Sequence, residues 1–401
     1  MGLFEIEDKV TQSNNQVKQC NSCTYSSPLG LTQQFRFCGN AFRVDMYKGC
    51  DFGCKYCFAN GMSAKGHNDG FAEAKIEQVE KLFTKAFDTQ DMTNDITIEL
   101  LRKKVPLHCG GMSDPFQKRE FEHKLTYKLI ELSNKYQYPI IFSTKTSQLP
   151  KEYFDILDPN IHAFQISIMG WDDEYIRKYE TNTPTAKERL EFLKKLRELG
   201  FWCSIRVQPL VNLEQAIKLL ENASTYPSYV TIEHLKILCT NDKINKLFVD
   251  EYANTTYKKA DHFRIEVEPA IKQKNIEVLM KLANSNKVLV GVGDNDLHHL
   301  SQSRCCCGID TIQGNMFDNW LKYNLTYFVT GECESPDLLW TPKCNCRKCF
   351  FSDAVKPQFR KFTDFKEITK DYIKTNNNLV YKSKYENVLH KLGLDLNNRL
   401  F

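Results

Sequence analysis

Three cysteines lie close together early in the chain, at Cys50, Cys54 and Cys57. Their spacing of four and three residues lets three thiolates face inward from one tight loop, and Gly49 and Gly53 lower the steric cost of such a turn. Thiolate ligands suit soft metals and iron–sulfur clusters. Three protein ligands on a four-iron cluster would leave one iron open, and an open position distinguishes a catalytic metal centre from a closed structural one.

The alternative interpretation of this loop is a structural zinc site or a plain cluster of buried thiols. A zinc site would need a fourth ligand nearby. His67 and Cys38 are the candidates, and neither has the usual zinc spacing. The pattern therefore favours an iron–sulfur cluster.

A second set of cysteines lies in the last quarter of the chain. Its members are Cys305, Cys306, Cys307, Cys344, Cys346 and Cys349. The last three are close enough in sequence to chelate one centre, and one of the first three could supply a fourth ligand. Basic neighbours such as Arg304 and Lys343 would offset the thiolate charge. We expect an auxiliary iron–sulfur cluster here, with structural zinc or unliganded thiols as alternatives.

The composition limits the class of protein. The chain has 401 residues, 16 cysteines, 42% hydrophobic residues and a net charge of +4. Clustered cysteines in a long chain without an apolar signal core indicate metal ligation rather than disulfides. No stretch approaches the roughly 20 apolar residues of a membrane span, so we expect a cytoplasmic protein without membrane contact. A net charge this small neither requires nor excludes a nucleic-acid partner.

From about residue 41, short apolar runs alternate with segments of helical period. The predicted strands are residues 42–47, 105–109, 139–144, 163–169, 202–209 and 229–237. The predicted helices cover 73–87 and 186–199, with further helices carrying Phe121 to Leu132 and Leu213 to Leu220. This order predicts an α/β fold, a partial (βα)6 barrel of the TIM type with parallel strands and functional groups at their carboxyl ends.

Three regions are expected along the chain. Residues 1–40 form a polar extension, 41–300 the barrel, and 301–401 a small cysteine-rich module with a basic tail. The tail, residues 356–401, carries ten Lys or Arg against five Asp or Glu, with aromatic residues between them. Such a tail can follow a nucleic-acid backbone and stack on bases. A solvated amphipathic helix is the simpler interpretation.

The cysteine loop, with Tyr56 just before its last cysteine, resembles the signature of the radical S-adenosylmethionine (SAM) superfamily. The wider string GCDFGCKYCFAN, which includes Phe58, is similar to the branch that contains spore photoproduct lyase. The resemblance implies that the open iron binds the amino and carboxylate groups of SAM. One electron then cleaves SAM to methionine and a 5′-deoxyadenosyl radical, which abstracts hydrogen from a substrate. A low-potential electron donor such as a flavodoxin or ferredoxin is also implied.

The same resemblance covers roughly residues 35 to 240 and assigns further positions to SAM binding. These are Tyr56, Phe58, Gly110, Gly111, Ser113, Lys145, Ser167, Glu180 and Arg206. The two glycines would let the backbone approach the SAM amino group, and Ser167 would face the ribose. Glu180 and Arg189 could equally form an ordinary surface ion pair. Arg206 lies inside a predicted strand, where a charged residue usually points to a site or a buried partner.

One departure from the photoproduct lyase pattern concerns the hydrogen donor. In that branch a cysteine near the second-strand motif donates hydrogen to the product radical, whereas here Gly111 stands at that place. Cys109 lies two residues earlier and would share a strand face with that position. It is a candidate donor, with a packed thiol as the alternative. The sequence thus leaves three hypotheses: a radical SAM enzyme with an unidentified substrate, a nucleic-acid repair or modification enzyme, and a non-catalytic zinc-binding protein.

Overall fold

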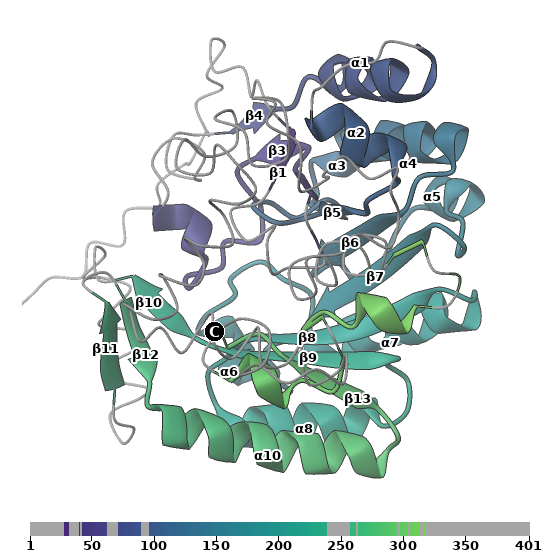
Figure 1. Ribbon diagram of the computed structural model, residues 1–401. Coiled ribbons are helices and arrows are strands. Elements are labelled where there is room, and N and C mark those ends of the chain that lie inside the picture. Colours follow the sequence, from purple (N-terminus) through teal and green to yellow (C-terminus); the bar gives the residue numbers. More distant parts are fainter. Residues whose placement is uncertain are drawn as a thin grey trace, which may run out of the picture.

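The computed structural model describes residues 28–31, 40, 42–61, 71–89, 96–238, 257–261, 264–294, 297–303, 305–312, 314, 316 and 317. The main sheet of this part has the strand order β1-β2-β5-β6-β7-β8-β9-β13 (Figure 1). Neighbouring strands pair in parallel, except that β1 is antiparallel to β2. The bounds are β1 Leu29–Leu31, β2 Phe42–Val44, β5 Leu107–Cys109, β6 Ile140–Thr144, β7 His162–Ser167, β8 Trp202–Leu210, β9 Tyr229–His234 and β13 Leu289–Val292.

This sheet confirms the predicted α/β fold with parallel strands. The strand β13, which was not among the six predicted, adds a further parallel strand beside β9. Two predicted strands are each divided in the structure. The first becomes β2 and β3 (Tyr47–Lys48), and the last becomes β9 and β10 (Lys236–Leu238).

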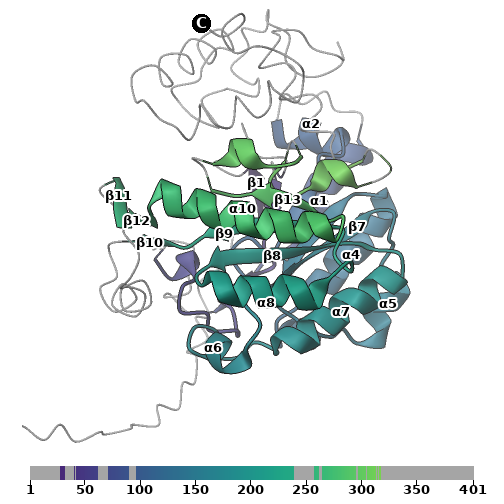
Figure 2. The same ribbon diagram turned by 90° about the horizontal axis from the view of Figure 1, so that it is seen from below.

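Helices cover the outer side of the curved sheet, and α10 lies beside α8 (Figure 2). Their bounds are α1 Ile76–Phe87, α2 Ile96–Arg102, α3 Glu120–His123, α4 Leu125–Tyr136, α5 Lys151–Ile156, α6 Asp173–Arg177, α7 Ala186–Glu198, α8 Leu213–Ala223 and α10 Pro269–Ser285. A capping box of Thr185 and Glu188 starts α7, close to the predicted boundary. The single helix predicted through Phe121 and Leu132 is wrong, because Lys124 adopts a left-handed conformation that separates α3 from α4.

Two small antiparallel sheets complete the described part. The strands β3 and β4 (Ala72–Glu73) form one, and β10, β12 (Arg264–Val267) and β11 (Tyr257–Asp261) form the other. Short 3-10 helices lie at Phe58–Gly61, His298–Leu300 and Ile309–Thr311. None of the helices within the described ranges is both long and apolar enough to cross a bilayer.

The two faces of the main sheet differ in polarity. Residues paired in register on parallel strands point to the same face. The outer, helix-facing side carries apolar or small residues, among them Cys109, Phe142, Phe164 and Cys203. The inner side carries polar residues, among them His108, Ser143, Gln165, Ser204, Arg206 and Thr231. The fold therefore presents a row of polar side chains to the inside of the partial barrel.

Candidate functional site

The cysteine loop follows β3 directly. Gly49 and Gly53 take positive φ angles of 87° and 62°, as the tight turn requires. Cys50, Cys54 and Cys57 are all partly exposed. Cys54 forms an isolated antiparallel bridge with Glu180, and the amide of Cys57 donates to the carbonyl of Cys54 at 3.2 Å. The loop thus carries three accessible thiols on a fixed backbone.

Two segments distant in sequence hold this loop. On one side, Gln117 accepts a hydrogen bond from the amide of Asp51 at 2.9 Å and donates to the carbonyl of Gly49 at 3.2 Å. On the other side, the amide of Asn182 donates to the carbonyl of Phe52 at 3.1 Å. Gln117 is completely buried, and a buried side-chain amide needs hydrogen-bond partners. The two bonds to the loop supply a partner for its oxygen and for its nitrogen. The loop is therefore preorganised before any metal binds.

The spacing of the sulfur atoms separates two kinds of metal site. Among the described residues, only the group Cys305, Cys306 and Cys307 places three or more ligand atoms of His, Cys, Asp or Glu within 4.8 Å of one another. The sulfurs of Cys50, Cys54 and Cys57 are therefore spread more widely. In a four-iron cluster each cysteine binds a different iron, whereas ligands of one zinc ion crowd together. The donor set of the loop fits the cluster better than a single ion.

Two thiols of the loop, those of Cys50 and Cys54, are held neutral when no metal is bound. Burial raises the pKa of Cys50 well above its usual value and that of Cys54 to about 12. Only thiolates bind metal strongly, so cluster assembly must release these protons. Loading is therefore expected to depend on pH and to improve as pH rises.

A buried charged network lies beside the loop. Arg189 pairs with Glu180 at 2.9 Å, and both side chains are 0% exposed. Lys145 approaches the same carboxylate at 3.8 Å, and the hydroxyl of Tyr56 donates to it. Burial raises the pKa of Glu180, but the charges of Arg189 and Lys145 outweigh burial and hold that pKa below its usual value. The idea of a surface ion pair between Glu180 and Arg189 is wrong, because the pair is fully enclosed.

The glycine turn after β5 lies against β6. Gly110 has a φ of 104°, and a Cβ there would stand 2.2 Å from the carbonyl oxygen of Ser143. The carboxylate of Asp45 accepts from the amide of Met112 at 2.8 Å, and the hydroxyl of Ser113 donates to the carbonyl of Tyr47 at 2.7 Å. Ser113 therefore ties the turn to the strand that precedes the cysteine loop. Its hydroxyl is engaged with the chain itself.

We predict that Gly110→Ala destabilises this turn by about 2 kcal/mol or more, because alanine would combine backbone strain with a clash. SAM binding should weaken by roughly tenfold or more, since 1.4 kcal/mol corresponds to a factor of ten. Calorimetric titration with SAM would measure the effect. Gly30→Ala is the matched control, because a Cβ at Gly30 meets nothing within 4 Å. Equal SAM affinity in the two variants would contradict the prediction.

The remaining predicted positions fall in different environments. Ser167 and Arg206 are paired in register and point to the inner face of the barrel. Phe58 is 52% exposed at the start of the 3-10 helix that follows the loop. Cys109 is fully buried on the outer face, in register with Phe142. This placement favours the packed thiol over the hydrogen donor, because the inside of the barrel lies on the other side of the sheet.

Two buried acidic residues, Asp114 and Asp45, hold the backbone of the site. The sequence analysis gave neither of them a role. Asp114 accepts from the hydroxyl of Thr144 at 2.7 Å and from the amide of Lys145 at 2.6 Å. Asp45 holds the glycine turn. Asp114 directly follows Ser113 of the glycine turn in the sequence, and Asp45 is an acid inside the predicted strand 42–47 that stands directly after β2 in the structure. An acidic residue at that position is a feature of the sequence from which a role for Asp45 could have been predicted.

The inner face carries a continuous polar network. His108 Nε2 lies 2.7 Å from the hydroxyl of Ser143, which also accepts from Arg206 at 2.8 Å. Arg206 donates to Gln165 at 3.3 Å and to the side-chain oxygen of Gln208. Burial and the charge of Arg206 lower the pKa of His108 to about 4, so His108 is neutral at physiological pH. This network lies on the inner wall of the barrel, and Arg206 is its one positively charged member.

The later cysteines are only partly described. Cys305, Cys306 and Cys307 lie beside β9 and β13, where the hydroxyl of Thr231 donates to the carbonyl of Cys306 at 3.0 Å. This part of the expected C-terminal module thus packs against the barrel. Cys344, Cys346 and Cys349 lie outside the described residues, as does the basic tail.

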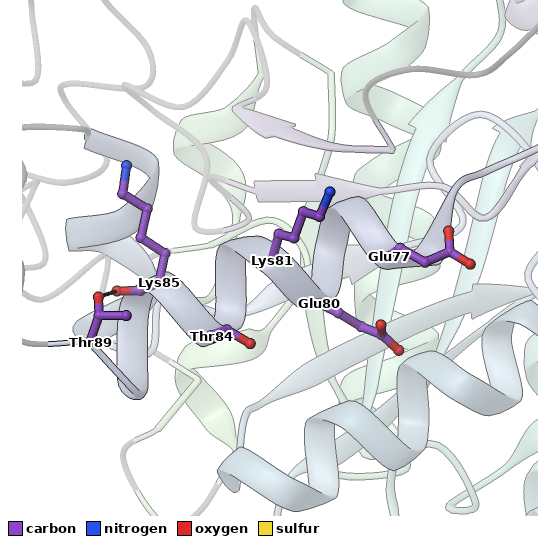
Figure 3. Close-up of a pocket in the computed structure, with 6 residues that line it drawn as sticks. All are labelled: Glu77, Glu80, Lys81, Thr84, Lys85 and Thr89. Carbon is purple, nitrogen blue, oxygen red and sulfur yellow. Dashed lines mark hydrogen bonds between the residues drawn. The ribbon is translucent and has the colours of Figure 1, made fainter.

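A hollow on the outer face of α1 is a solvated surface feature. It is lined by Glu77, Glu80, Lys81, Thr84, Lys85 and Thr89 (Figure 3). All six side chains are exposed, and they include two acidic and two basic groups. Such a mixed-charge face is typical of a helix in contact with water. We assign it no functional role.

A family model described as the radical SAM superfamily matches residues 44–222. This part of the chain is therefore similar to radical SAM domains. The match runs from the end of β2 into α8 and includes the cysteine loop, the glycine turn, Lys145, Glu180 and Arg206. For proteins of the radical SAM superfamily, the family implies a four-iron cluster and SAM as cofactors and a reductant as partner.

Two curated relatives show low sequence identity to this chain. Uncharacterized proteins of Mycobacterium tuberculosis and Mycobacterium bovis are each 24% identical over 203 residues, which is 48% of this chain. The chain spans about half the length of these curated relatives, 54%.

Two solved structures with a similar arrangement show lower sequence identity. A spore photoproduct lyase with bound SAM and a dinucleoside spore photoproduct is 16% identical, with a TM-score of 0.45 over 64% of this chain and 78% of that one. SuiB of Streptococcus suis, bound to SAM, is 12% identical, with a TM-score of 0.44 over 63% of this chain and 49% of its own.

Proposed function

We propose that the protein is a radical SAM enzyme that cleaves SAM reductively and abstracts hydrogen from a substrate still to be identified. The observation that carries the proposal is the cysteine loop of Cys50, Cys54 and Cys57. Its sulfurs are spread beyond the spacing of a single-ion site, and the loop lies within the matched domain. When bound there, a four-iron cluster supplies an open iron for SAM and the electron that cleaves it to a 5′-deoxyadenosyl radical.

The chain's own residues have distinct tasks in this proposal. Cys50, Cys54 and Cys57 hold the three ligated irons, and the turn at Gly110 and Gly111 receives the amino end of SAM. Ser167 and Arg206 project into the barrel, where the adenosine and substrate would lie. Glu180 does not touch SAM in this proposal. It anchors Lys145 and Tyr56 beside the loop and acts as a positioning residue.

The barrel also has to keep water away from a reactive radical. Its inner wall presents side chains whose polar atoms already bond to one another, as in the set of His108, Ser143, Gln165 and Arg206. Such a wall offers few free donors to recruit water. A low-potential flavodoxin or ferredoxin would supply the electron, and its docking surface is unassigned.

The test of this proposal is metal and sulfide analysis of protein purified without oxygen, followed by incubation with SAM and dithionite. About four irons per chain and formation of 5′-deoxyadenosine are the expected results. Zinc without iron, after anaerobic reconstitution, would overturn the proposal. The non-catalytic zinc-binding protein would then be the correct interpretation.

A second cysteine-bound metal centre belongs to the proposal. Cys305, Cys306 and Cys307 can supply three thiolates, while Cys344, Cys346 and Cys349 lie outside the described residues. The sequence alone left an auxiliary iron–sulfur cluster, structural zinc and unliganded thiols as alternatives at these cysteines.

A nucleic-acid substrate is the narrower form of the proposal, and it rests on the basic tail and on the resemblance to the photoproduct lyase branch. It predicts that binding to a DNA or RNA oligonucleotide weakens steeply with salt, because phosphate contacts release counterions. For six phosphate contacts, affinity should fall by about a thousandfold between 50 and 200 mM salt. Fluorescence anisotropy would measure this. Affinity independent of salt would remove the nucleic-acid hypothesis and leave the radical SAM activity untouched.

A further inference from the structure

The three consecutive cysteines after β13 form a compact group of sulfur atoms. The sulfurs of Cys305, Cys306 and Cys307 all lie within 4.8 Å of one another, and those of Cys306 and Cys307 are 3.9 Å apart. Cys305 is 2% exposed and Cys307 is 7% exposed. Three thiols gathered together, two of them buried and that of Cys306 partly exposed, are a donor set for a thiophilic metal.

The spacing of these sulfurs identifies the kind of centre they suit. Zinc–sulfur bonds of about 2.3 Å in a tetrahedral site place two sulfurs roughly 3.8 Å apart. The observed 3.9 Å between Cys306 and Cys307 is close to that value, and the whole group is only slightly wider. Cysteines on a four-iron cluster bind different irons and must stand further apart. The geometry favours one ion over an auxiliary cluster.

The backbone that carries the thiols is fixed by the barrel. Thr231 donates to the carbonyl of Cys306 at 3.0 Å, and Gln165 donates to the carbonyl of Cys307 at 3.3 Å. The amide of Cys305 donates to Asp310 at 3.2 Å. Gly291 allows the closest approach, since a Cβ there would stand 2.1 Å from the carbonyl oxygen of Cys306. The thiols are thus held together without a metal, which lowers the entropic cost of binding one.

A positive charge lies next to this group. Gln165 connects Arg206 to Cys307, because it accepts from Arg206 at 3.3 Å and donates to the Cys307 carbonyl. In the described ranges Arg206 forms hydrogen bonds with Ser143, Gln165 and Gln208. Three thiolates around a divalent ion carry one net negative charge, which Arg206 would offset in a poorly solvated place.

We propose that Cys305, Cys306 and Cys307 bind a single zinc-type divalent ion in the inner wall of the barrel, with Arg206 as its charge partner. The three thiolates leave the fourth tetrahedral position to water or to a donor supplied by a substrate. This site is separate from the cysteine loop, and its occupancy does not depend on the cluster there.

The experiment is a paired metal analysis of the full-length chain purified without oxygen. The unmodified protein should contain about one zinc in addition to about four irons per chain. Cys307→Ser should lose most of the zinc and keep the iron, whereas Cys54→Ser should lose the iron and keep the zinc. The iron retained by Cys307→Ser also reports that the variant has folded. Failure of the cluster proposal and failure of the zinc proposal are thereby distinguished.

Arg206→Met keeps all three thiols and tests the charge partner. Loss of a group that supports metal ligands typically weakens affinity by roughly 10- to 100-fold, and this variant should lose zinc to a competing chelator to that extent. The triple variant Cys344→Ser, Cys346→Ser, Cys349→Ser should retain the zinc. Three results would each overturn the proposal: full zinc in Cys307→Ser, loss of further iron instead of zinc in that variant, or loss of zinc in the triple variant.

Discussion

Replacing Cys54 with alanine is expected to remove most of the iron and to abolish SAM cleavage. In the proposed function each cysteine of the loop holds one iron, so the loss of Cys54 would leave two ligands for a cluster that needs three. We expect the rate of 5′-deoxyadenosine formation to fall by ~100-fold or more, which corresponds to about 2.7 kcal/mol of lost transition-state stabilisation. Iron analysis and chromatography of the nucleoside product under anaerobic conditions measure the two effects.

The fold should survive this substitution. The loop is held by Gln117 from one side and by Asn182 from the other, through bonds to the backbone of Gly49, Asp51 and Phe52. None of these bonds uses the Cys54 side chain. Unchanged far-ultraviolet circular dichroism is therefore expected.

Cys203→Ala is the matched control for Cys54→Ala. Cys203 is fully buried in β8 on the helix-facing side of the sheet, in register with Phe164. Its loss should cost about 1 kcal/mol of stability and leave iron and cleavage unchanged. SAM cleavage retained in Cys54→Ala at the rate of the Cys203→Ala control would remove the cluster assignment.

The alternation of strands and helices from β5 to β9 could be predicted because each strand is a short apolar run and each long helix has a regular apolar face. The break at Lys124 could not, since α3 and α4 carry one continuous apolar period and only the left-handed residue divides them. The strand β13 carried a signal, the apolar run Leu289–Val292 after a helical segment. The six-strand prediction ended before it.

The site was predictable in parts. The cysteine spacing indicated the loop, and the polar residues Ser143, Gln165 and Arg206 each interrupt an apolar strand, which is a signal for a polar inner face. The sequence could not reveal that Cys305 to Cys307 pack on the barrel. That contact depends on the approach of a backbone carbonyl to Gly291, which only the tertiary structure defines. The burial of Glu180 and Arg189 is also a tertiary property. From the sequence alone, two charged residues are expected at the surface.

Arg189→Leu is expected to cost more stability than any other single change near the site. The guanidinium pairs with Glu180 at 2.9 Å and donates to the carbonyl of Ser167 at 2.7 Å. Leucine would leave a buried carboxylate with only Lys145 as a charged partner, at 3.8 Å. Breaking a buried pair from one side typically costs about 3–5 kcal/mol. Thermal unfolding should show a melting temperature lower by roughly 5–15 °C.

The double variant Arg189→Leu, Glu180→Gln is the control for this interpretation. Removing the carboxylate charge together with its partner should recover part of the lost stability, because the main penalty is the unpaired buried charge. A double variant no more stable than Arg189→Leu alone would show that packing of the arginine stem, rather than charge pairing, is the dominant contribution.

The pH dependence gives the pair an independent signature. The pKa of Glu180 in the folded protein lies below its usual value of 4.5, so its ionised form stabilises the fold above that pH. This contribution is lost as pH falls below 4.5 toward the folded-state pKa. In Arg189→Leu the pKa of Glu180 should rise, so the difference in stability between variant and unmodified protein should narrow as the pH is lowered. Because Cys54 bridges to Glu180 through the backbone, the same variant should also retain less iron, which links the buried pair to the geometry of the cluster loop.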